Sequence, residues 1–427
     1  MKKSSVKKRV ATILLAVLAA VSLGLACFFM STPNTNVVGA FTSEHTEAFG
    51  SASGHDPLSG EGDNITETDL KTLTATDNVI TIDTAGSYYL SADLNAALVI
   101  DISDSGDDKT VYLCLNGHVL DAFVANTSAI TVESGALVLH DCMENSTNDD
   151  HQHTYYVNKH GKYEFDDGSE EWDTAYAAAA DDEKSSVTGG VITGGTGTVS
   201  TNNKDEDTTY GGGIFLEGSG ASLTMYGGTI AGNMAKRDIT ETGYSPDDAT
   251  YGGGVYVGGG KTFNMYGGTI EGNTAGSSSN GTTAEENNDL NNDHDRGGGV
   301  AVNGGTFNMY GGTIKNNAAD DGAGVYASGD SSFTMYGDIA NTQGEGTYSP
   351  VISGNNARHN GGGVYLNQGT AQIGGTVDGT AYEGGSIENN TALSFDMHPK
   401  SWTDFWRCMF SCQEERSLTQ STRQNSR

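Results

Sequence analysis

Metal-binding residue types crowd one short stretch of the chain. His140, Asp141 and Cys142 are consecutive, and His151 and His153 follow shortly after them. A zinc ion takes such side chains, but only when they converge with tetrahedral geometry. The spacing here is irregular and the surrounding sequence is polar. We therefore predict a solvated loop at this point and no zinc site.

A second stretch offers many oxygen ligands. The run at 287–295 contains Asp289, Asp293 and Asp295 between asparagines. Carboxylate and amide oxygens suit calcium. The run lacks the regular ligand spacing of a calcium-binding loop, so we predict a flexible acidic loop. Calcium is the one cofactor that these residues could hold.

The second of these stretches interrupts a repeat that organises the second half of the chain. Glycine-rich segments begin at 211, 252 and 297, and looser copies begin at 322 and 361. Self-similarity at a period of about 25 residues indicates a solenoid, in which each unit packs mainly on its neighbours.

Each unit divides into three short segments. Val255 and Val257 lie one residue apart, as do Phe263 and Met265, and a lone Ile270 follows. Period-two patterns between glycines indicate strands and turns, and no helix fits among such closely spaced glycines. Like strands of successive units can pair about 4.8 Å apart. We therefore predict an all-β, single-stranded parallel β-helix, with Val, Phe, Met and Ile inside.

Like residues of successive units should form columns, so that Ile270 lies next to Ile314. A corner asparagine can bond to its own turn and to the same residue in the next coil, and it tolerates left-handed backbone. We expect such a ladder at Asn233, Asn273, Asn317, Asn355 and Asn390.

The outer surface should carry polar and aromatic columns. We expect Tyr256, Asn264 and Tyr266 to point outward. One line of tyrosines forms a candidate strip for a carbohydrate or protein ligand: Tyr226, Tyr266, Tyr310 and Tyr336. The alternative is that these rings only stack and stabilise the sheet surface.

Two motifs alternate through 211–392. Gly-Gly-(Gly/Ala)-(Ile/Val) or its Gly-Ala-Gly-Val variant occurs at 211–214, 252–255, 297–300, 322–325 and 361–364, and Ile-x-x-Asn occurs at 230–233, 270–273, 314–317, 352–355 and 387–390. This alternation resembles the GGA[ILV] and FxxN repeats of chlamydial-type polymorphic outer-membrane proteins, usually with Gly for Ala and with Ile for Phe. The resemblance implies a right-handed, pectin-lyase-like β-helix that is displayed at a cell surface as an adhesin. It stops at residue 392.

The segments outside the repeat differ in composition. Residues 1–40 begin with lysines and continue into an uncharged apolar run at 10–30, which is typical of a cleaved export signal or a retained membrane anchor. Residues 41–75 form a polar, acidic linker. Residues 393–427 contain no glycine and do not follow the repeat, so we interpret them as a cap or as a frameshifted or truncated gene end.

The segment between linker and repeat has less regular strand patterns. We interpret 76–200 as irregular N-terminal coils of the same solenoid, with an excursion at 143–186, and 201–392 as the regular coils. Cys114 and Cys142 occupy similar apolar segments. In an exported protein they could form a disulfide between adjacent coils, and the alternative is a pair of buried thiols.

Catalysis on a polysaccharide is the rival hypothesis, because such sites need paired carboxylates or carboxylate-bound calcium with a base. The outward positions that we expect in 211–335 carry no charge: Phe215, Thr224, Tyr256, Asn264, Ala301 and Asn308. An Asp pair on adjacent coils is not expected there, although 77–192 could contain a site. We therefore predict a protein without catalysis. A polysaccharide lyase or a glycoside hydrolase is the alternative.

The charge of the chain limits its partners. The formal net charge is −33 at pH 7, which argues against nucleic acid and anionic membranes as ligands. We predict an exported protein, secreted or at the cell surface. It would bind a glycan or a surface protein, and would meet a membrane only through its N-terminal apolar segment.

Overall fold

The computed structural model describes residues 67–392 except 103–108, 123, 145–150, 158–162, 167–168, 202–206, 219, 238–248, 278–294, 338, 341–346, 378–379 and 383. The predicted signal or anchor at 1–40 and the tail at 393–427 lie outside the described residues, as does most of the linker. Within the described part, no helix is long and apolar enough to cross a membrane.

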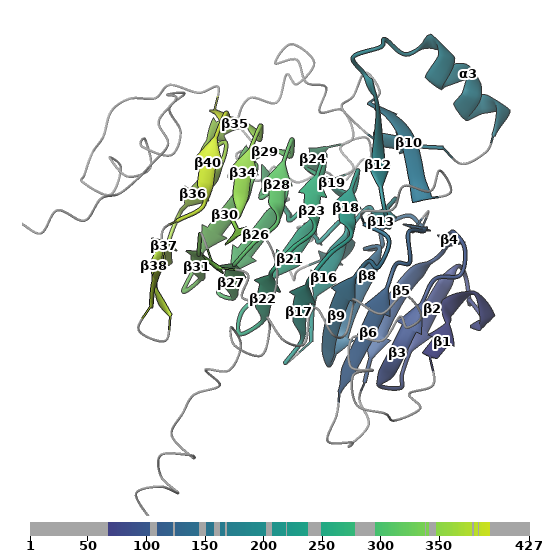
Figure 1. Ribbon diagram of the computed structural model, residues 1–427, viewed down its shortest axis with the longest axis horizontal. Coiled ribbons are helices and arrows are strands. Elements are labelled where there is room, and N and C mark those ends of the chain that lie inside the picture. The colour runs from purple at the N-terminus through teal and green to yellow at the C-terminus, as the bar shows by residue number, and fades with distance from the viewer. Residues whose placement is uncertain are drawn as a thin grey trace, which may run out of the picture.

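Three long parallel sheets run the length of the molecule (Figure 1). Sheet A contains β1 Glu67–Asp69, β3 Gly86–Tyr89, β6 Thr110–Cys114, β9 Ala136–His140, β17 Ser222–Met225, β22 Thr262–Met265, β27 Thr306–Met309, β31 Ser332–Met335 and β37 Thr370–Ile373. Sheet B contains β2 Val79–Ile82, β5 Ala97–Asp101, β8 Ile130–Ser134, β16 Ile214–Leu216, β21 Val255–Val257, β26 Val300–Asn303, β30 Val325–Ser328 and β36 Val364–Leu366. Sheet C contains β4 Leu94–Asn95, β7 Val119–Asp121, β13 Val191–Thr193, β18 Thr229–Ala231, β23 Thr269–Glu271, β28 Thr313–Lys315, β34 Val351–Ser353 and β40 Ser386–Glu388.

The chain visits these sheets in a fixed order. It runs through β21 in sheet B, β22 in sheet A and β23 in sheet C, and the next coil repeats this path with β26, β27 and β28. Phe263 pairs with Phe307 and Ile270 with Ile314, so the predicted register of like residues is confirmed. The chain is all-β with parallel sheets, an arrangement consistent with a β-helix.

A fourth sheet, sheet E, connects sheet C back to sheet B. It contains β14 Thr198–Thr201, β15 Asp207–Tyr210, β19 Met234–Arg237, β20 Ala249–Tyr251, β24 Thr274–Ser277, β25 Asp295–Arg296, β29 Ala318–Asp321, β35 Asn356–Asn360 and β41 Thr391–Ala392. The unbroken strand β29 pairs with β24 at its start and with β25 at its end. The insertion between β24 and β25 therefore leaves the coil in the middle of a strand that is continuous one coil later.

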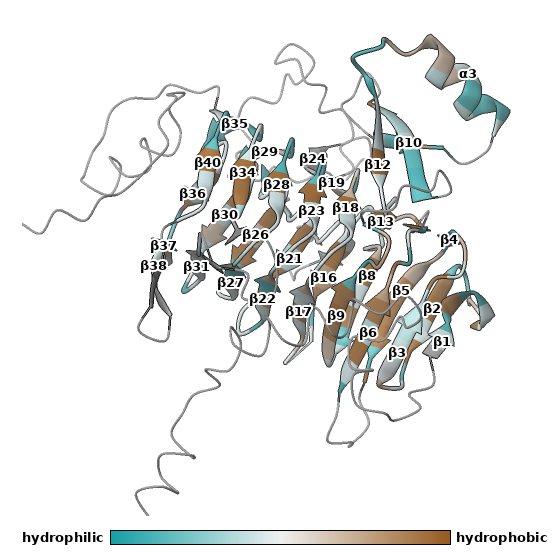
Figure 2. Ribbon diagram, in the orientation of Figure 1, coloured by the Kyte–Doolittle hydropathy of each residue, from teal (hydrophilic) through white to brown (hydrophobic). Residues whose placement is uncertain are grey.

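Apolar side chains from sheets A, B and C fill the interior. Figure 2 shows hydrophobic residues along the stacked strands. Phe263, Phe307 and Phe333 are fully buried and stack with centroids 4.7 and 5.3 Å apart. At the N-terminal end, a short 3₁₀ helix, η1 Leu70–Thr72, places the fully buried Leu70 in this core.

The glycine triplets make the turn from sheet E to sheet B. The first glycine is left-handed, with φ of 73° at Gly252 and 70° at Gly297. A Cβ on the third glycine would collide with the next coil, since at Gly254 it would lie 2.6 Å from the carbonyl oxygen of Gly299. Close stacking of the coils therefore requires glycine at this turn.

The expected excursion between β9 and β13 leaves the stack as a small module (Figure 1). Sheet D is antiparallel and consists of β10 Gln152–Val157, β11 Tyr163–Phe165 and β12 Lys184–Thr188. The helix α3 Glu170–Ala178 is capped at its N-terminus by Ser169, whose hydroxyl accepts the Trp172 backbone N–H. Two short hairpins also leave the later coils: β32 Ile339–Ala340 with β33 Thr347–Tyr348, and β38 Gly375–Val377 with β39 Thr380–Tyr382.

Candidate functional site

The corner asparagines form a continuous ladder between sheets C and E. The Nδ2 of Asn317 donates to the Ile270 carbonyl one coil below at 3.0 Å and to the Asn355 Oδ1 one coil above at 2.9 Å. Its own Oδ1 accepts the backbone N–H and the Nδ2 of Asn273. Each rung therefore joins three coils inside the protein, and its amide is not available to a ligand.

The left-handed backbone at these corners belongs to the residue before each ladder asparagine. Positive φ values occur at Gly232, Gly272, Asn316, Gly354 and Asn389. The expectation that the ladder asparagines themselves supply this conformation is wrong. The preceding residue turns the chain, which directs the next side chain inward, and Asn273 and Asn317 are fully buried.

The four strip tyrosines stack in one column beside sheet A. Ring centroids lie 5.2 Å apart for Tyr226 and Tyr266, 4.6 Å for Tyr266 and Tyr310, and 4.9 Å for Tyr310 and Tyr336, with planes within 13° of parallel. The ring faces contact each other and the Tyr266 hydroxyl is buried, so a ligand can reach only the outer edges of the half-buried rings.

Burial within this column alters the phenols. Tyr266 is only 3% exposed, so the expectation of a fully outward Tyr266 is wrong, and its pKa lies above its ordinary range because of burial and the charges of the neighbouring phenols. Burial, followed by the neighbouring Tyr336, raises the pKa of Tyr310 to about 12. These hydroxyls stay protonated at neutral pH and can both donate and accept hydrogen bonds.

The tyrosine column borders two further columns on the outer face of sheet A. We call this surface the polar face: Ser222, Thr224, Tyr226, Thr262, Asn264, Tyr266, Thr306, Asn308, Tyr310, Ser332, Thr334, Tyr336, Thr370 and Gln372. Thr262 and Asn264 are half-buried, as are Thr306 and Asn308, while the apolar residues between them point inward. The Asn308 Nδ2 donates to the Asn264 Oδ1 at 2.9 Å. All of these side chains are uncharged hydroxyls, amides or phenols.

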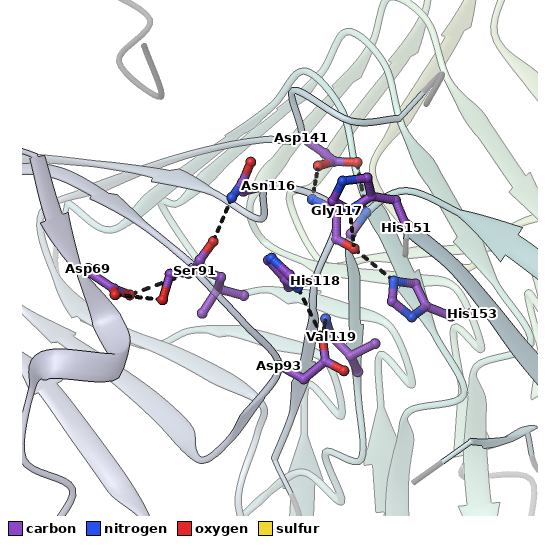
Figure 3. A network of polar contacts seen from close by, with 12 residues as sticks. Asp69, Ser91, Asp93, Asn116, Gly117, His118, Val119, Asp141, His151 and His153 are labelled. Atoms are coloured by element: carbon purple, nitrogen blue, oxygen red, sulfur yellow. Dashed lines mark hydrogen bonds and ion pairs between the residues drawn. The ribbon is translucent and has the colours of Figure 1, made fainter. Parts of the chain in front are cut away.

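The histidine-rich stretch does not form the predicted solvated loop (Figure 3). His140 is 2% and Asp141 is 8% exposed. The Asp141 carboxylate accepts the backbone N–H groups of Gly117 and Gly190, both at 2.7 Å, and of Met143 at 3.2 Å. The carboxylate thereby fastens both ends of the excursion to the coil, because Met143 begins that excursion and Gly190 follows it.

Three histidines surround the same turn (Figure 3). The Nε2 of His153 lies 2.8 Å and the Nδ1 of His151 3.4 Å from the Gly117 carbonyl oxygen. The Nδ1 of His118 lies 3.3 Å from the Asp93 Oδ1, which also accepts the Val119 N–H. The hydrogen bond from His118 holds the pKa of Asp93 below its ordinary value. These contacts hold the excursion on its coil, and across the described ranges no group of three ligand side chains could hold a metal ion.

Cys114 and Cys142 lie beside His140 and Asp141, and both are free thiols. Cys114 pairs in register with His140, and Cys142 follows two residues later. The sulfurs are 3.4 Å apart, and Cys114 is fully buried. Burial is the main cause that raises the pKa of Cys114. Of the two alternatives left open by the sequence, this structure has the pair of thiols.

Of the three calcium candidates, the structure describes only Asp295. Asp289 and Asp293 lie outside the described residues. Asp295 begins β25, is 1% exposed and accepts the Thr250 hydroxyl at 2.9 Å. It is thus part of the wall of the stack, because β25 belongs to sheet E.

A pair of aspartates on adjacent coils escaped the sequence analysis. Arg296 pairs with Asp321, which places Asp295 next to Asp320 one coil later. Asp320 is also 1% exposed and lies 3.6 Å from the Arg358 Nε. The statement that 211–335 contains no such pair is therefore wrong. The pair is visible in the sequence when the two residues before each glycine turn are aligned, because Asp295 and Asp320 then occupy the same position. The outward residues considered above all lie after the turn.

Aromatic rings cover the outer face of sheet B next to this pair. Tyr256 is 8% exposed, which corrects its expected position on an open surface. In its column Ala301 separates Tyr256 from Tyr326. The Arg296 guanidinium lies against Tyr251 and Tyr326, with centroid distances of 5.2 and 5.8 Å, and Nη1 donates to the Tyr251 hydroxyl at 2.6 Å. These side chains pack against one another and form part of the outer surface of sheets B and E.

Compared with protein-family models, with curated proteins and with solved structures, the chain shows no match.

Proposed function

We propose that this chain is a non-catalytic binding scaffold displayed outside the cell, and that the polar face of sheet A binds its ligand. One observation supports the proposal above the others. The formal net charge of the chain is −33, yet the polar face carries no charged side chain over five neighbouring strands. A surface of hydroxyls, amides and phenols suits a glycan or a polar protein surface.

The handedness of the stack and the export of the chain are part of the same proposal. We infer that the stack is a right-handed, pectin-lyase-like β-helix, as the resemblance to polymorphic outer-membrane adhesins implies. The apolar run at 10–30 would direct export, as a cleaved signal or as a retained anchor. A rigid stack that presents a ligand surface at a distance from the cell is consistent with an adhesin.

A charge placed on the polar face tests the proposal. Asn308→Lys should abolish binding to glycan arrays or to immobilised host or environmental cells, because the ammonium disrupts a continuous uncharged surface. Ser200→Lys, on the exposed strand β14, is the matched control and should bind as the wild type does. Equal binding by both variants would place the ligand surface elsewhere.

The paired aspartates favour one alternative function, a polysaccharide lyase or a glycoside hydrolase. Two carboxylates on adjacent coils are what acid–base cleavage of a glycosidic bond requires. Both are 1% exposed, and Arg358 and Thr250 contact them, which favours a structural ion-pair role. A screen of acidic polysaccharides with calcium present tests this alternative. Turnover that disappears in both Asp295→Asn and Asp320→Asn would replace the scaffold proposal.

Export would also change the cysteine pair. We propose that Cys114 and Cys142 form a disulfide when an exported oxidoreductase or an oxidised thiol reagent accepts their two electrons and two protons. Closing a loop of this length stabilises by about 3.5 kcal/mol. In protein recovered from outside the cell, the peptides that contain Cys114 and Cys142 should resist alkylation until the protein is reduced, whereas the Cys114→Ser variant should be alkylated at Cys142 directly. Alkylation of both residues without reductant, read by peptide mass spectrometry, would contradict the bond.

A further inference from the structure

We propose that the ligand of the polar face is a neutral, extended β-linked polysaccharide that runs along the stack with about one sugar per coil. This inference rests on the proposed function and deepens it, because it names the ligand class and its direction.

The spacing of the columns supports this direction. Neighbouring strands lie about 4.8 Å apart, and the ring centroid of Tyr310 lies 4.6 Å from that of Tyr266 and 4.9 Å from that of Tyr336. Thr262, Thr306 and Ser332 occupy one register position on successive coils. A hydroxyl thus returns at this position on every one of these coils. A fully extended β-1,4-linked chain advances by a similar length for each ring, so successive sugars would meet equivalent side chains.

The chemistry of the columns fits sugar hydroxyls. Threonine and tyrosine hydroxyls donate and accept, and asparagine amides do both through separate atoms. Asn264 and Asn308 already bond to each other along the column, which fixes their orientation before a ligand arrives. The tyrosine faces are occupied by stacking. Recognition would therefore depend on hydrogen bonds at ring edges and only slightly on stacking of sugars over aromatic faces.

Charge selects among glycans. An acidic polysaccharide would need cations to offset its carboxylates, and the polar face supplies none, while the chain as a whole is strongly acidic. Long-range repulsion would lower both the association rate and the affinity for such a polymer. A neutral polymer avoids this cost. The same argument separates the proposed ligand from the acidic substrates of the alternative enzyme function.

The experiment is calorimetric titration of the full exported chain with oligosaccharides of increasing length. Neutral β-1,4-linked glucose and N-acetylglucosamine series, from disaccharide to hexasaccharide, are compared with galacturonate oligomers of equal length. Affinity for a neutral series should rise about fivefold with each added sugar, since each coil adds about one net hydrogen bond, and should level off near the pentasaccharide. Asn308→Lys should remove this gain, and Ser200→Lys should keep it.

Other outcomes would overturn the inference in distinguishable ways. Affinity that does not change with length would indicate a single-sugar site, and tighter binding of galacturonate would contradict the charge argument. Binding to cells through the polar face without binding to either neutral series would leave the proposed function intact and refute the glycan. Cell binding unchanged in Asn308→Lys would refute the proposed function itself.

Discussion

The coils before residue 194 and those after residue 211 are held together by different means. The later coils use one device at every level, the asparagine ladder, which begins at Asn233 and continues to Asn390. Their interior repeats as well, with Phe263, Phe307 and Phe333 in one stack.

The earlier coils use a separate polar contact at each level. The Asp69 carboxylate accepts the Ser91 hydroxyl at 2.6 Å, and the Asn116 Nδ2 donates to the Leu90 carbonyl at 2.9 Å. Asp93 and Asp141 then accept backbone N–H groups at the turn that carries the excursion (Figure 3). Aliphatic residues such as Leu98 and Leu113 fill the interior.

This difference teaches what each region can tolerate. A ladder distributes its hydrogen bonds over many equivalent rungs, but each rung is buried and serves two neighbours. A unique contact serves one turn, so its loss should remain local. The excursion that carries sheet D leaves the N-terminal coils before the ladder begins, so its attachment depends on Asp141 and not on a rung.

The largest effect is expected for a rung in the middle of the ladder. Asn317→Ala should lower the free energy of unfolding by about 3–5 kcal/mol, because the Asn273 N–H and the Ile270 carbonyl lose buried partners. Urea titration of the purified variant measures this loss.

The matched control is the last rung. Asn390 is only half-buried, so Asn390→Ala should cost about 1 kcal/mol, since water can replace part of what is lost. Similar losses at both positions would show that the ladder does not depend on burial, and the comparison between the two regions would weaken.

The next effect concerns the unique contact at Asp141. Asp141→Ala should cost about 2–4 kcal/mol because the N–H groups of Gly117 and Gly190 lose a charged acceptor. Hydrogen exchange should rise in β10 and β12 and stay unchanged in the coils after residue 211. Asp93→Ala, at a more exposed carboxylate, is the milder control. Increased exchange throughout the stack would contradict local action.

A pH dependence should distinguish the earlier coils from the later ones. Burial, and then the charge of Asp141, raises the pKa of Glu144 to about 7 from an ordinary value of 4.5. Because the folded pKa is raised, this group's stabilising contribution is present below pH 4.5 and is lost as pH rises through 7. The expected loss is about 3 kcal/mol.

Glu144→Gln should remove this part of the pH profile, because the amide stays neutral throughout. Urea titrations of both proteins at a series of pH values test it. An unchanged slope between pH 4.5 and 7 in the variant would assign the dependence to other groups.

The smallest effect is expected on the tyrosine column. Tyr310→Phe keeps both stacking faces and should change stability by less than about 0.5 kcal/mol, whereas Tyr310→Ala should cost about 1–2 kcal/mol. If Tyr310→Phe destabilises as much as Tyr310→Ala, the hydroxyl and not the stack supports the face.

The regular coils could be predicted because their evidence is local and repeated. Glycine triplets, paired apolar residues and Ile-x-x-Asn each limit one short segment, and five repetitions fix the register. The positions of Ile270 and Ile314 followed directly from this repetition. The same period predicts the tyrosine column. It does not predict that Tyr266 is only 3% exposed.

The polar contacts of the earlier coils could not be predicted, because they join residues far apart in sequence. Nothing near His140 and Asp141 in the sequence indicates that Gly117 and Gly190 will approach them. The pairing of Asp295 with Asp320 was missed for a different reason. One regular coil lies between them, and both precede the glycine turn, whereas the comparison of outward residues covered only strand positions after that turn.

The sequence alone determined the architecture: short strands of period two, glycine turns and a constant repeat leave stacking of like on like as the way to bury the apolar residues. Only the tertiary structure decided which polar side chains face solvent and which are enclosed. That outcome depends on what the neighbouring coil and the excursion place over each residue, and burial is a property of the assembled surface, which no single repeat encodes.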